Sequence, residues 1–331
     1  MAVQVRWDSS APLARGLRMT GCAAEPSPHP LARPGAGERE KRATRCGTLD
    51  RGGQSAMIPT LSESQVDAYL RVLGVAEATP GRGALDELVR AQATRIPFEN
   101  ISKLYRFKHQ GLDGIPSIQD YLDGIERFHF GGSCYPNNFH FYRLLCTLGY
   151  DAALCGADMP SGEDVHAAIT VAIEGRDLLA DVGYGAPFLE PLPRDVGHDV
   201  VIPFGRDRYV LRPRDDQGRS RLDMYRDGEL IHGYLLKPTP RPIEHFSQVV
   251  RDSFRPSATF MNAVELVRFS DADSVVIYNL SIIRSTVDRF SIERLNDREE
   301  LVQAIEREFG IPVEIARDAI AGLGTFRDVH G

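Results

Sequence analysis

The sequence lacks several features that would assign it to a class at once. No hydrophobic run approaches the roughly 20 residues that a membrane-spanning helix needs. Positive charge is not in excess: the formal net charge of the 331 residues is −7, which argues against a general nucleic-acid-binding protein. No CxxC pair, Walker loop or GxGxxG loop in a strand–turn–helix setting occurs. We therefore expect no membrane contact, no nucleic-acid partner and no metal ion.

Cysteine is also scarce. An odd number of cysteines without a recognisable spacing is typical of the reducing cytosol, so we expect a cytoplasmic protein. With 42% hydrophobic residues, the chain can build its own core. The five cysteines are Cys22, Cys46, Cys134, Cys146 and Cys155.

Periodicity divides the chain into a helical region followed by a β-rich region. Short β segments separated by Gly, Pro and Asp-Gly turns fill residues 150–250, as in a small barrel or sandwich. Segments 274–283 and 286–295 predict a hairpin, and Asn296 with Glu299 predicts a capping box at the start of a last helix. Helices are predicted over 64–75, 84–93, 118–125, 137–148 and 297–309.

Cys134 is the cysteine whose surroundings suit a nucleophile. It follows the flexible residues GGS and precedes the predicted helix over 137–148. Pro136 fits the first helical turn, where its missing N–H costs nothing. These features place Cys134 at or just before a helix N-terminus, where the helix dipole and unbonded N–H groups favour a thiolate and can hold an oxyanion.

His166 and Asp181 are predicted to meet across a hairpin. Glu174-Gly175 is a turn signal, and if these two residues form the loop, position 168 lies opposite Asp181. His166 and Asp181 then share one face of the sheet as diagonal neighbours, about 7 Å apart at the backbone. A histidine can accept the proton of a thiol, and a carboxylate can orient that histidine.

Other interpretations of the same residues remain open. A buried inert cysteine, a surface histidine and a turn-capping aspartate would also explain them. His129 and His140 flank the Cys134 segment as alternative bases. His140 is predicted to point away from the thiol, and His129 is predicted to be structural.

Three segments, in this order, resemble the signature segments of the arylamine N-acetyltransferase family. They are RIPFENIS (95–102), GGSCYPNN (131–138) and HAAITVAIEGRDLLADVGYG (166–185). VDAYLRVLGV (66–75) resembles the family's opening helix, and SFRPSATFMNAVELVR (253–268) resembles a later segment. The resemblance runs from about residue 57 to the C-terminus.

The resemblance implies an α+β fold with a cysteine-protease-like Cys-His-Asp core. We expect a helical bundle over 57–150 that carries the nucleophile, a small β-barrel over 151–250 and an α/β lid over 251–331. Residues 1–56 are rich in Pro, Gly and Ala and lack the apolar segment of a secretory signal. We expect them to be a disordered extension or to precede the natural start at Met57.

The same resemblance implies an acyltransferase that uses acetyl-CoA by a ping-pong acetyl-cysteine mechanism. Its acceptors would be small aromatic amines, hydrazines or N-hydroxyarylamines, as in xenobiotic metabolism. Asn138 matches an asparagine that follows the family's cysteine by four residues. The implied site residues are catalytic Cys134, His166 and Asp181, acceptor-binding Phe98 and Tyr184, and cofactor-binding Gly183 and Gly185.

Three positions depart from the family pattern. The family's arginine, aromatic residue and glutamate or glutamine around the cysteine are replaced by Phe130, Ser133 and Pro136. Glu99 then loses an arginine partner, for which Arg95 or Arg127 could substitute. The departures leave three alternatives: an amide synthase of the same fold with a carrier-bound or other acyl donor, a cysteine hydrolase that uses water as acceptor, and a binding relative with impaired catalysis.

Overall fold

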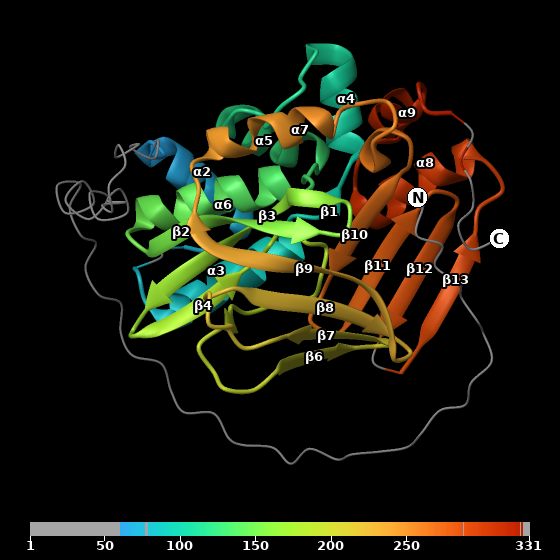
Figure 1. Cartoon of the computed structure of the whole chain (residues 1–331). Helices are drawn as coiled ribbons and strands as arrows, with labels where there is room; N and C mark the ends of the chain where they lie inside the picture. The colour runs from blue at the N-terminus through green and yellow to red at the C-terminus, as the bar shows by residue number, and fades with distance from the viewer. Residues whose placement is uncertain (1–59, 77–78, 287, 325, 327–331) are drawn as a thin grey trace.

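The computed structural model describes residues 60–76, 79–286, 288–324 and 326, and the predicted extension over 1–56 lies outside them. Figure 1 shows a layer of helices lying against two antiparallel sheets. The helices are α2 (Glu63–Leu73), α3 (Arg82–Arg95), α4 (Ile101–Gln110), α5 (Ile118–Phe128), α6 (Cys134–Leu148), α7 (Ser247–Asp252), α8 (Arg298–Phe309) and α9 (Val313–Ile320), with 3₁₀ turns η1 (Ile243–Phe246) and η2 (Thr259–Met261).

The larger sheet has eight strands and curls into a nearly closed, barrel-like form. Its interior is one apolar cluster in which Ala168 and Leu179 from one end of the strand order join Leu211 and Leu222 from the other. The strands follow in the order β5 (Leu192–Pro193), β4 (Arg176–Ala180), β3 (Gly162–Ile173), β2 (Asp151–Met159), β9 (Glu229–Pro240), β8 (Ser220–Arg226), β7 (Asp207–Leu211) and β6 (Val200–Phe204).

The hairpin of β3 and β4 has the predicted register. Ile173 lies opposite Arg176 and Ile169 lies opposite Ala180, so Glu174 and Gly175 form the two-residue loop. Both loop residues have positive φ, 51° and 76°, which is the backbone twist that such tight hairpins require. Strand β3 begins at Gly162, so His166 lies inside the strand rather than at its start.

The helical layer packs on the outer face of β2 and β3. The apolar stripe of α6, including Phe141 and Leu144, joins Leu70 of α2 and Leu85 of α3 in one core cluster with Ile169 of β3. Burial of such a stripe is the main stabilisation of an amphipathic helix. The packing fixes the start of α6 over the strand that carries His166.

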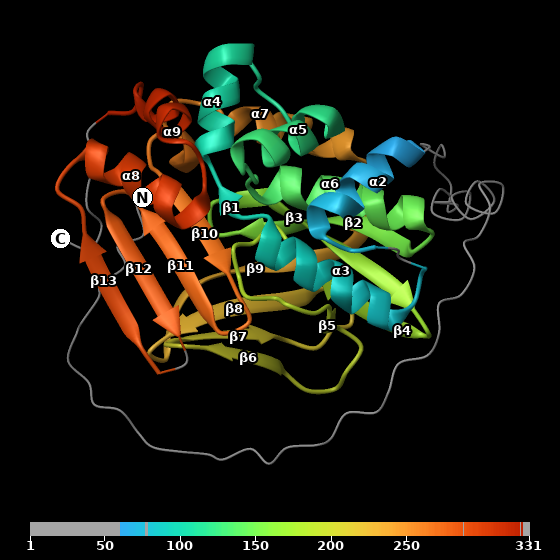
Figure 2. The ribbon, with the colours of Figure 1, turned by 180° about the vertical axis from the view of Figure 1, so that it is seen from behind.

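The smaller sheet contains five strands, and its first strand comes from the helical region. Figure 2 shows this sheet with α8 and α9 lying over it. Ile101 and Leu104 of α4 belong to the same apolar cluster as Leu266 of this sheet and Leu301 of α8. The strand order is β1 (Phe98–Glu99), β10 (Glu265–Phe269), β11 (Asp273–Tyr278), β12 (Ser281–Thr286) and β13 (Phe290–Arg294).

Two local predictions in this region are wrong. The predicted strand over 274–283 is two strands, because Asn279 adopts a left-handed φ of 49° and turns the chain. Helix α8, predicted as the last helix but followed by α9, is capped by Asp297, whose carboxylate accepts hydrogen bonds from the N–H groups of Glu299 and Glu300, each at 2.9 Å. The Asn296 side chain instead donates to Glu300, so the predicted capping box does not form.

Candidate active site

Cys134 is the first residue of α6, as the GGSC pattern predicts. Ser133 is the N-cap, with extended backbone angles of φ −77° and ψ −170°. The preceding loop is held against β1, because Gly131 N–H donates to the buried carboxylate of Glu99 at 3.0 Å and Gly132 N–H donates to the Pro97 carbonyl at 3.3 Å. The thiol therefore lies beside the positive end of the helix.

His166 lies buried in β3 with its imidazole against Asp181. The Nε2 of His166 is 2.8 Å from the Oδ2 of Asp181. Burial lowers the pKa of His166, but the charge and hydrogen bond of Asp181 outweigh burial and raise this pKa to about 10. A hydrogen bond with the Cys134 side chain raises it further, and since Asp181 occupies Nε2, the nitrogen that faces the thiol is Nδ1.

Asp181 is buried and receives hydrogen bonds from three further groups. Tyr234 O–H donates to Oδ2 at 2.8 Å. The Asn138 side-chain amide and the Gly183 N–H donate to Oδ1 at 2.8 Å and 3.1 Å. Burial alone would raise the pKa of Asp181, but His166 and these donors lower it, so the carboxylate is ionised.

The loop after Asp181 packs directly on the helix that carries the thiol. A Cβ added to Gly183 would lie 2.6 Å from the Cys134 carbonyl oxygen and 2.6 Å from Asn138 Nδ2. Gly185 has a left-handed φ of 71° and lies against the Phe98 ring. Both glycines therefore allow the close approach of this loop to the start of α6 and to β1.

The two aromatic residues implied by the resemblance lie on either side of this loop. Phe98 packs edge-to-face on Phe260, with ring centroids 5.7 Å apart. Tyr184 packs edge-to-face on His166 at 5.4 Å, and its hydroxyl lies 2.5 Å from His232 Nδ1. The structure thus brings all seven predicted site residues into one region.

Sequence reasoning missed two groups that shape this region. Tyr234 lies in β9, 53 residues after Asp181, and no local pattern relates the two. The cation whose charge acts on Glu99 is Arg106 of α4. Arg95 lies against Gly74 and Arg127 lies over the Phe128 ring, so the predicted substitution by either arginine is wrong.

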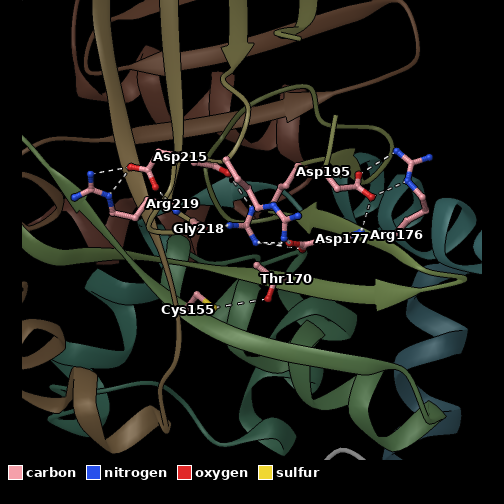
Figure 3. A network of polar contacts seen from close by, with 11 residues as sticks. Cys155, Thr170, Arg176, Asp177, Asp195, Asp215, Gly218 and Arg219 are labelled. Carbon is pink, nitrogen blue, oxygen red and sulfur yellow. Dashed lines mark hydrogen bonds and ion pairs between the residues drawn. The ribbon is translucent and has the colours of Figure 1, made fainter. Parts of the chain in front are cut away.

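The other cysteine and histidine candidates have different surroundings. Cys155, which is also a free cysteine, is fully buried beside Thr170, and burial raises the pKa of its thiol to about 11. Figure 3 shows this pair next to a network of arginine–aspartate ion pairs. The Nε2 of His140 lies 3.1 Å from the Pro116 carbonyl, and burial lowers the pKa of His140 to about 3. His129 is exposed and forms the C-cap of α5.

Two kinds of feature are absent from the described part of the chain. No group of three or more His, Cys, Asp or Glu side chains there could hold a metal ion. No helix there is long and apolar enough to cross a membrane.

A cysteine at a helix start lies near a buried histidine–aspartate pair on a barrel-like sheet, an arrangement of the kind that enzymes acting on acyl groups use. The family model described as N-acetyltransferase matches residues 83–318, well over half of the chain. The chain belongs to the arylamine N-acetyltransferase family, and the protein is an acyltransferase.

Individual relatives agree with this assignment. The chain is 24% identical to arylamine N-acetyltransferase 2 of Mus musculus over 286 residues, covering 75% of this chain and 94% of the mouse protein. It is 39% identical to proansamycin X synthase of Amycolatopsis mediterranei over 181 residues, covering 52% of this chain and 68% of that protein.

Solved structures share the fold. The arylamine N-acetyltransferase of Mycobacterium abscessus superposes with a TM-score of 0.66 at 18% identity, covering 78% of this chain and 95% of that one. The Mycobacterium marinum enzyme in complex with CoA superposes with a TM-score of 0.66 at 20% identity, covering 78% of this chain and 100% of that one.

Proposed function

We propose that the protein transfers an acetyl group from acetyl-CoA to small aromatic amines, hydrazines or N-hydroxyarylamines through an acetyl-cysteine at Cys134. The observation that carries this proposal is the buried His166–Asp181 pair hydrogen-bonded next to a thiol at a helix N-terminus. Family membership supports the reaction class, and a relative's complex with CoA supports the donor.

In the first half-reaction, Cys134 is the nucleophile. His166, held protonated by Asp181, stabilises the thiolate, which attacks the thioester carbonyl carbon. The backbone N–H groups at the start of α6 stabilise the oxyanion. The bond from carbonyl carbon to CoA sulfur breaks, His166 gives its proton to that sulfur, and CoA leaves as a thiol.

In the second half-reaction, His166 acts as a base. The amine nitrogen attacks the carbonyl carbon of the acetyl-cysteine, and His166 takes a proton from that nitrogen. The carbon–sulfur bond to Cys134 breaks, and the thiolate returns to its pairing with the imidazolium. Dividing the transfer into two covalent steps lowers each barrier.

The acceptor would lie between Phe98 and Tyr184. Phe98 is backed by Phe260, and Tyr184 lies against the ring of His166, so both aromatic residues are held in place near the proposed catalytic residues. In this proposal the donor lies beside the loop that Gly183 and Gly185 hold close to Cys134. The cytosol keeps thiols reduced, so a free Cys134 agrees with the proposed cytoplasmic location.

An amide synthase is the second candidate. Its support is the 39% identity over 181 residues to a relative that is named as a synthase, proansamycin X synthase, compared with 24% over 286 residues for the mouse N-acetyltransferase. The departures at Phe130, Ser133 and Pro136 agree with a different acyl donor. Dependence of arylamine acetylation on acetyl-CoA would separate this candidate from the first.

The test is mass spectrometry of the intact protein after incubation with acetyl-CoA and no amine. We expect one added acetyl group, located at Cys134 by peptide mapping and lost when an arylamine is added. Cys134→Ala should remain unmodified, and the buried Cys155→Ala should be acetylated like the wild type. Acetylation that persists in Cys134→Ala would rule out this nucleophile, and rapid loss of the acetyl group to water would favour a hydrolase.

A further inference from the structure

A pocket opens beside the first turn of α6, next to the proposed nucleophile. Its walls come from α4, the loop between α4 and α5, α7, and the residues before Cys134, including Gly132 and Ser133. Figures 1 and 2 both show α4, α5 and α7 gathered on the same side of the molecule, above the sheets. The pocket therefore leads from the surface to the N-terminal end of the helix that carries the thiol.

Two cations from α4 line this pocket. Lys103 and Arg106 are three residues apart and lie on one face of the helix. Arg106 is only 5% exposed; it donates to the Asp120 carbonyl at 2.6 Å and lies 5.5 Å from the Phe130 ring centroid. Among the residues that the structure describes, neither cation has a carboxylate within 4.0 Å.

Lys103 is partly buried, and its side chain has no carboxylate partner among the described residues. Its ammonium donates to the Ser253 hydroxyl at 2.7 Å and lies 4.1 Å from the Phe254 ring centroid. Burial lowers the pKa of Lys103 to about 8, and the charge of Cys134 opposes this shift. When Cys134 is acylated it no longer carries this charge, so the cation is then suited to an anion that a reactant supplies.

We propose that this pocket binds a carboxylate, or another anionic oxygen, of a reactant that meets Cys134, with the Lys103 ammonium as its donor. The proposal rests on the proposed function, because it assigns a substrate class to the same site. Ser133 and Tyr135, the chain neighbours of Cys134, line the same pocket, so an anion bound there would lie close to the reacting carbon. A distant phosphate of CoA does not meet that condition.

The remaining walls indicate what the anion is attached to. Leu112, Ile115, Val250 and Phe254 make the rest of the lining largely apolar. The cavity volume of about 30 Å³ has room for a carboxylate but not for a whole ring. The aromatic ring or short acyl chain that carries the carboxylate would therefore lie outside this cavity, on the side of Cys134. The carboxylate can belong to the amine, as in an aminobenzoate, or to the acyl donor, as in a dicarboxylic thioester.

The first test needs no knowledge of the natural substrate. Cys134 is alkylated with iodoacetate, which is anionic, and with iodoacetamide, which is neutral, and the ratio of the two rate constants is compared between variants. Any change in thiolate population affects both reagents equally, so the ratio isolates the attraction for the carboxylate. Lys103→Met should lower the ratio about tenfold, the size expected for one charge-assisted hydrogen bond.

Matched variants make this test specific. Lys103→Arg keeps the positive charge and should retain most of the ratio. Lys108→Met removes another lysine of α4, one that lies outside the pocket in an exposed ion pair with Asp318, and should leave the ratio as in the wild type. An equal ratio in Lys103→Met and the wild type would overturn the proposal, since Lys103 would then support only the thiolate or the fold.

The second test assigns the carboxylate to one reactant. One arm compares acylation of Cys134 by succinyl-CoA and acetyl-CoA without amine, and the other compares release of the acetyl group by 4-aminobenzoate and by its methyl ester. A preference for the anionic member that is lost in Lys103→Met identifies the reactant. If Lys103→Met loses the preference for the anionic reactant in neither arm, the proposal that Lys103 binds a carboxylate of a reactant is overturned. Acetylation of Cys134 itself tests the proposed function. A failure of the proposed function can therefore be told apart from a failure of the carboxylate proposal.

Discussion

The side-chain amide of Asn138 lies 2.8 Å from the Oδ1 of Asp181 and joins the helix of Cys134 to the loop that follows β4. The same amide donates to the Ala167 carbonyl, next to His166, at 2.7 Å, and the Asn138 Oδ1 accepts from Val182 N–H at 3.0 Å. One side chain therefore sets the spacing between the three elements that carry the thiol, the imidazole and the carboxylate.

Removing this amide should impair both stability and chemistry. Asn138→Ala removes one of the two donors to Asp181 Oδ1, the side-chain donor to the Ala167 carbonyl and the acceptor of the Val182 N–H. A buried group left without a partner costs about 1–3 kcal/mol. We expect a lower melting temperature and slower acetylation of Cys134, measured by calorimetry and by single-turnover mass spectrometry. Asn262→Ala, which removes an exposed amide that bonds only local carbonyls, is the control and should change neither.

Asp181→Asn should separate folding from catalysis. The amide is close in shape to the carboxylate but cannot balance the charge of a protonated His166, and it favours the wrong imidazole tautomer. We expect a folded protein whose single-turnover acetylation rate is lower by roughly 10²–10⁴-fold. Wild-type acetylation rates in a folded Asp181→Asn variant would show that the carboxylate does not act through His166.

The relation between His166 and Asp181 was predictable because it is local. A two-residue turn and a period of two determine which residues of a hairpin share a face, and the register of β3 and β4 follows both rules. The approach of Cys134 to His166 is different, since it depends on the packing of α6 on β3. Residue types and family resemblance indicate that approach, whereas periodicity does not.

Arg106 and Tyr234 were not predictable from local pattern. Asn100 is a residue type that often caps helices, but its side chain donates to the Phe260 and Ala263 carbonyls instead of capping α4. These are long-range contacts, so the orientation of Arg106 toward Glu99 could not be inferred. Tyr234 reaches Asp181 only because the larger sheet curls and brings β9 near the end of β4. Contacts of this kind depend on tertiary closure, to which single segments give no guide.

His166 should set the pH dependence of thiol reactivity. Its pKa, raised to about 10, keeps the imidazole protonated at neutral pH, where a free histidine with a pKa of about 6.5 is mostly neutral. The imidazolium favours the thiolate, so alkylation by iodoacetamide should stay fast as the pH falls to about 6. In His166→Ala the rate should instead rise with pH in the range of an ordinary thiol, about 8.5.

The measurement is the rate of Cys134 modification across this pH range, with Cys155→Ala as the background so that a single free thiol is followed among the described residues. Identical pH profiles for the wild type and His166→Ala would contradict the pairing of thiol and imidazole. A pH profile that shifts in His166→Ala but not in Asp181→Asn would show that the thiolate of Cys134 pairs with His166 without needing the carboxylate of Asp181.

Gly183→Ala tests whether the close approach of the loop to α6 is required. The new methyl carbon would lie 2.6 Å from the Cys134 carbonyl oxygen and 2.9 Å from the Cys134 Cα, so backbone rather than a flexible side chain must move. Overpacking of this kind typically costs about 1–3 kcal/mol. We expect a lower free energy of unfolding, measured by urea denaturation. We also expect slower acetylation of Cys134 in the protein that remains folded, because Asp181 and Cys134 are pushed apart.

Gly197→Ala is the matched control: a Cβ there meets nothing within 4 Å, and both quantities should stay at wild-type values. Equal behaviour of the two alanine variants would show that the loop and the helix do not need this contact.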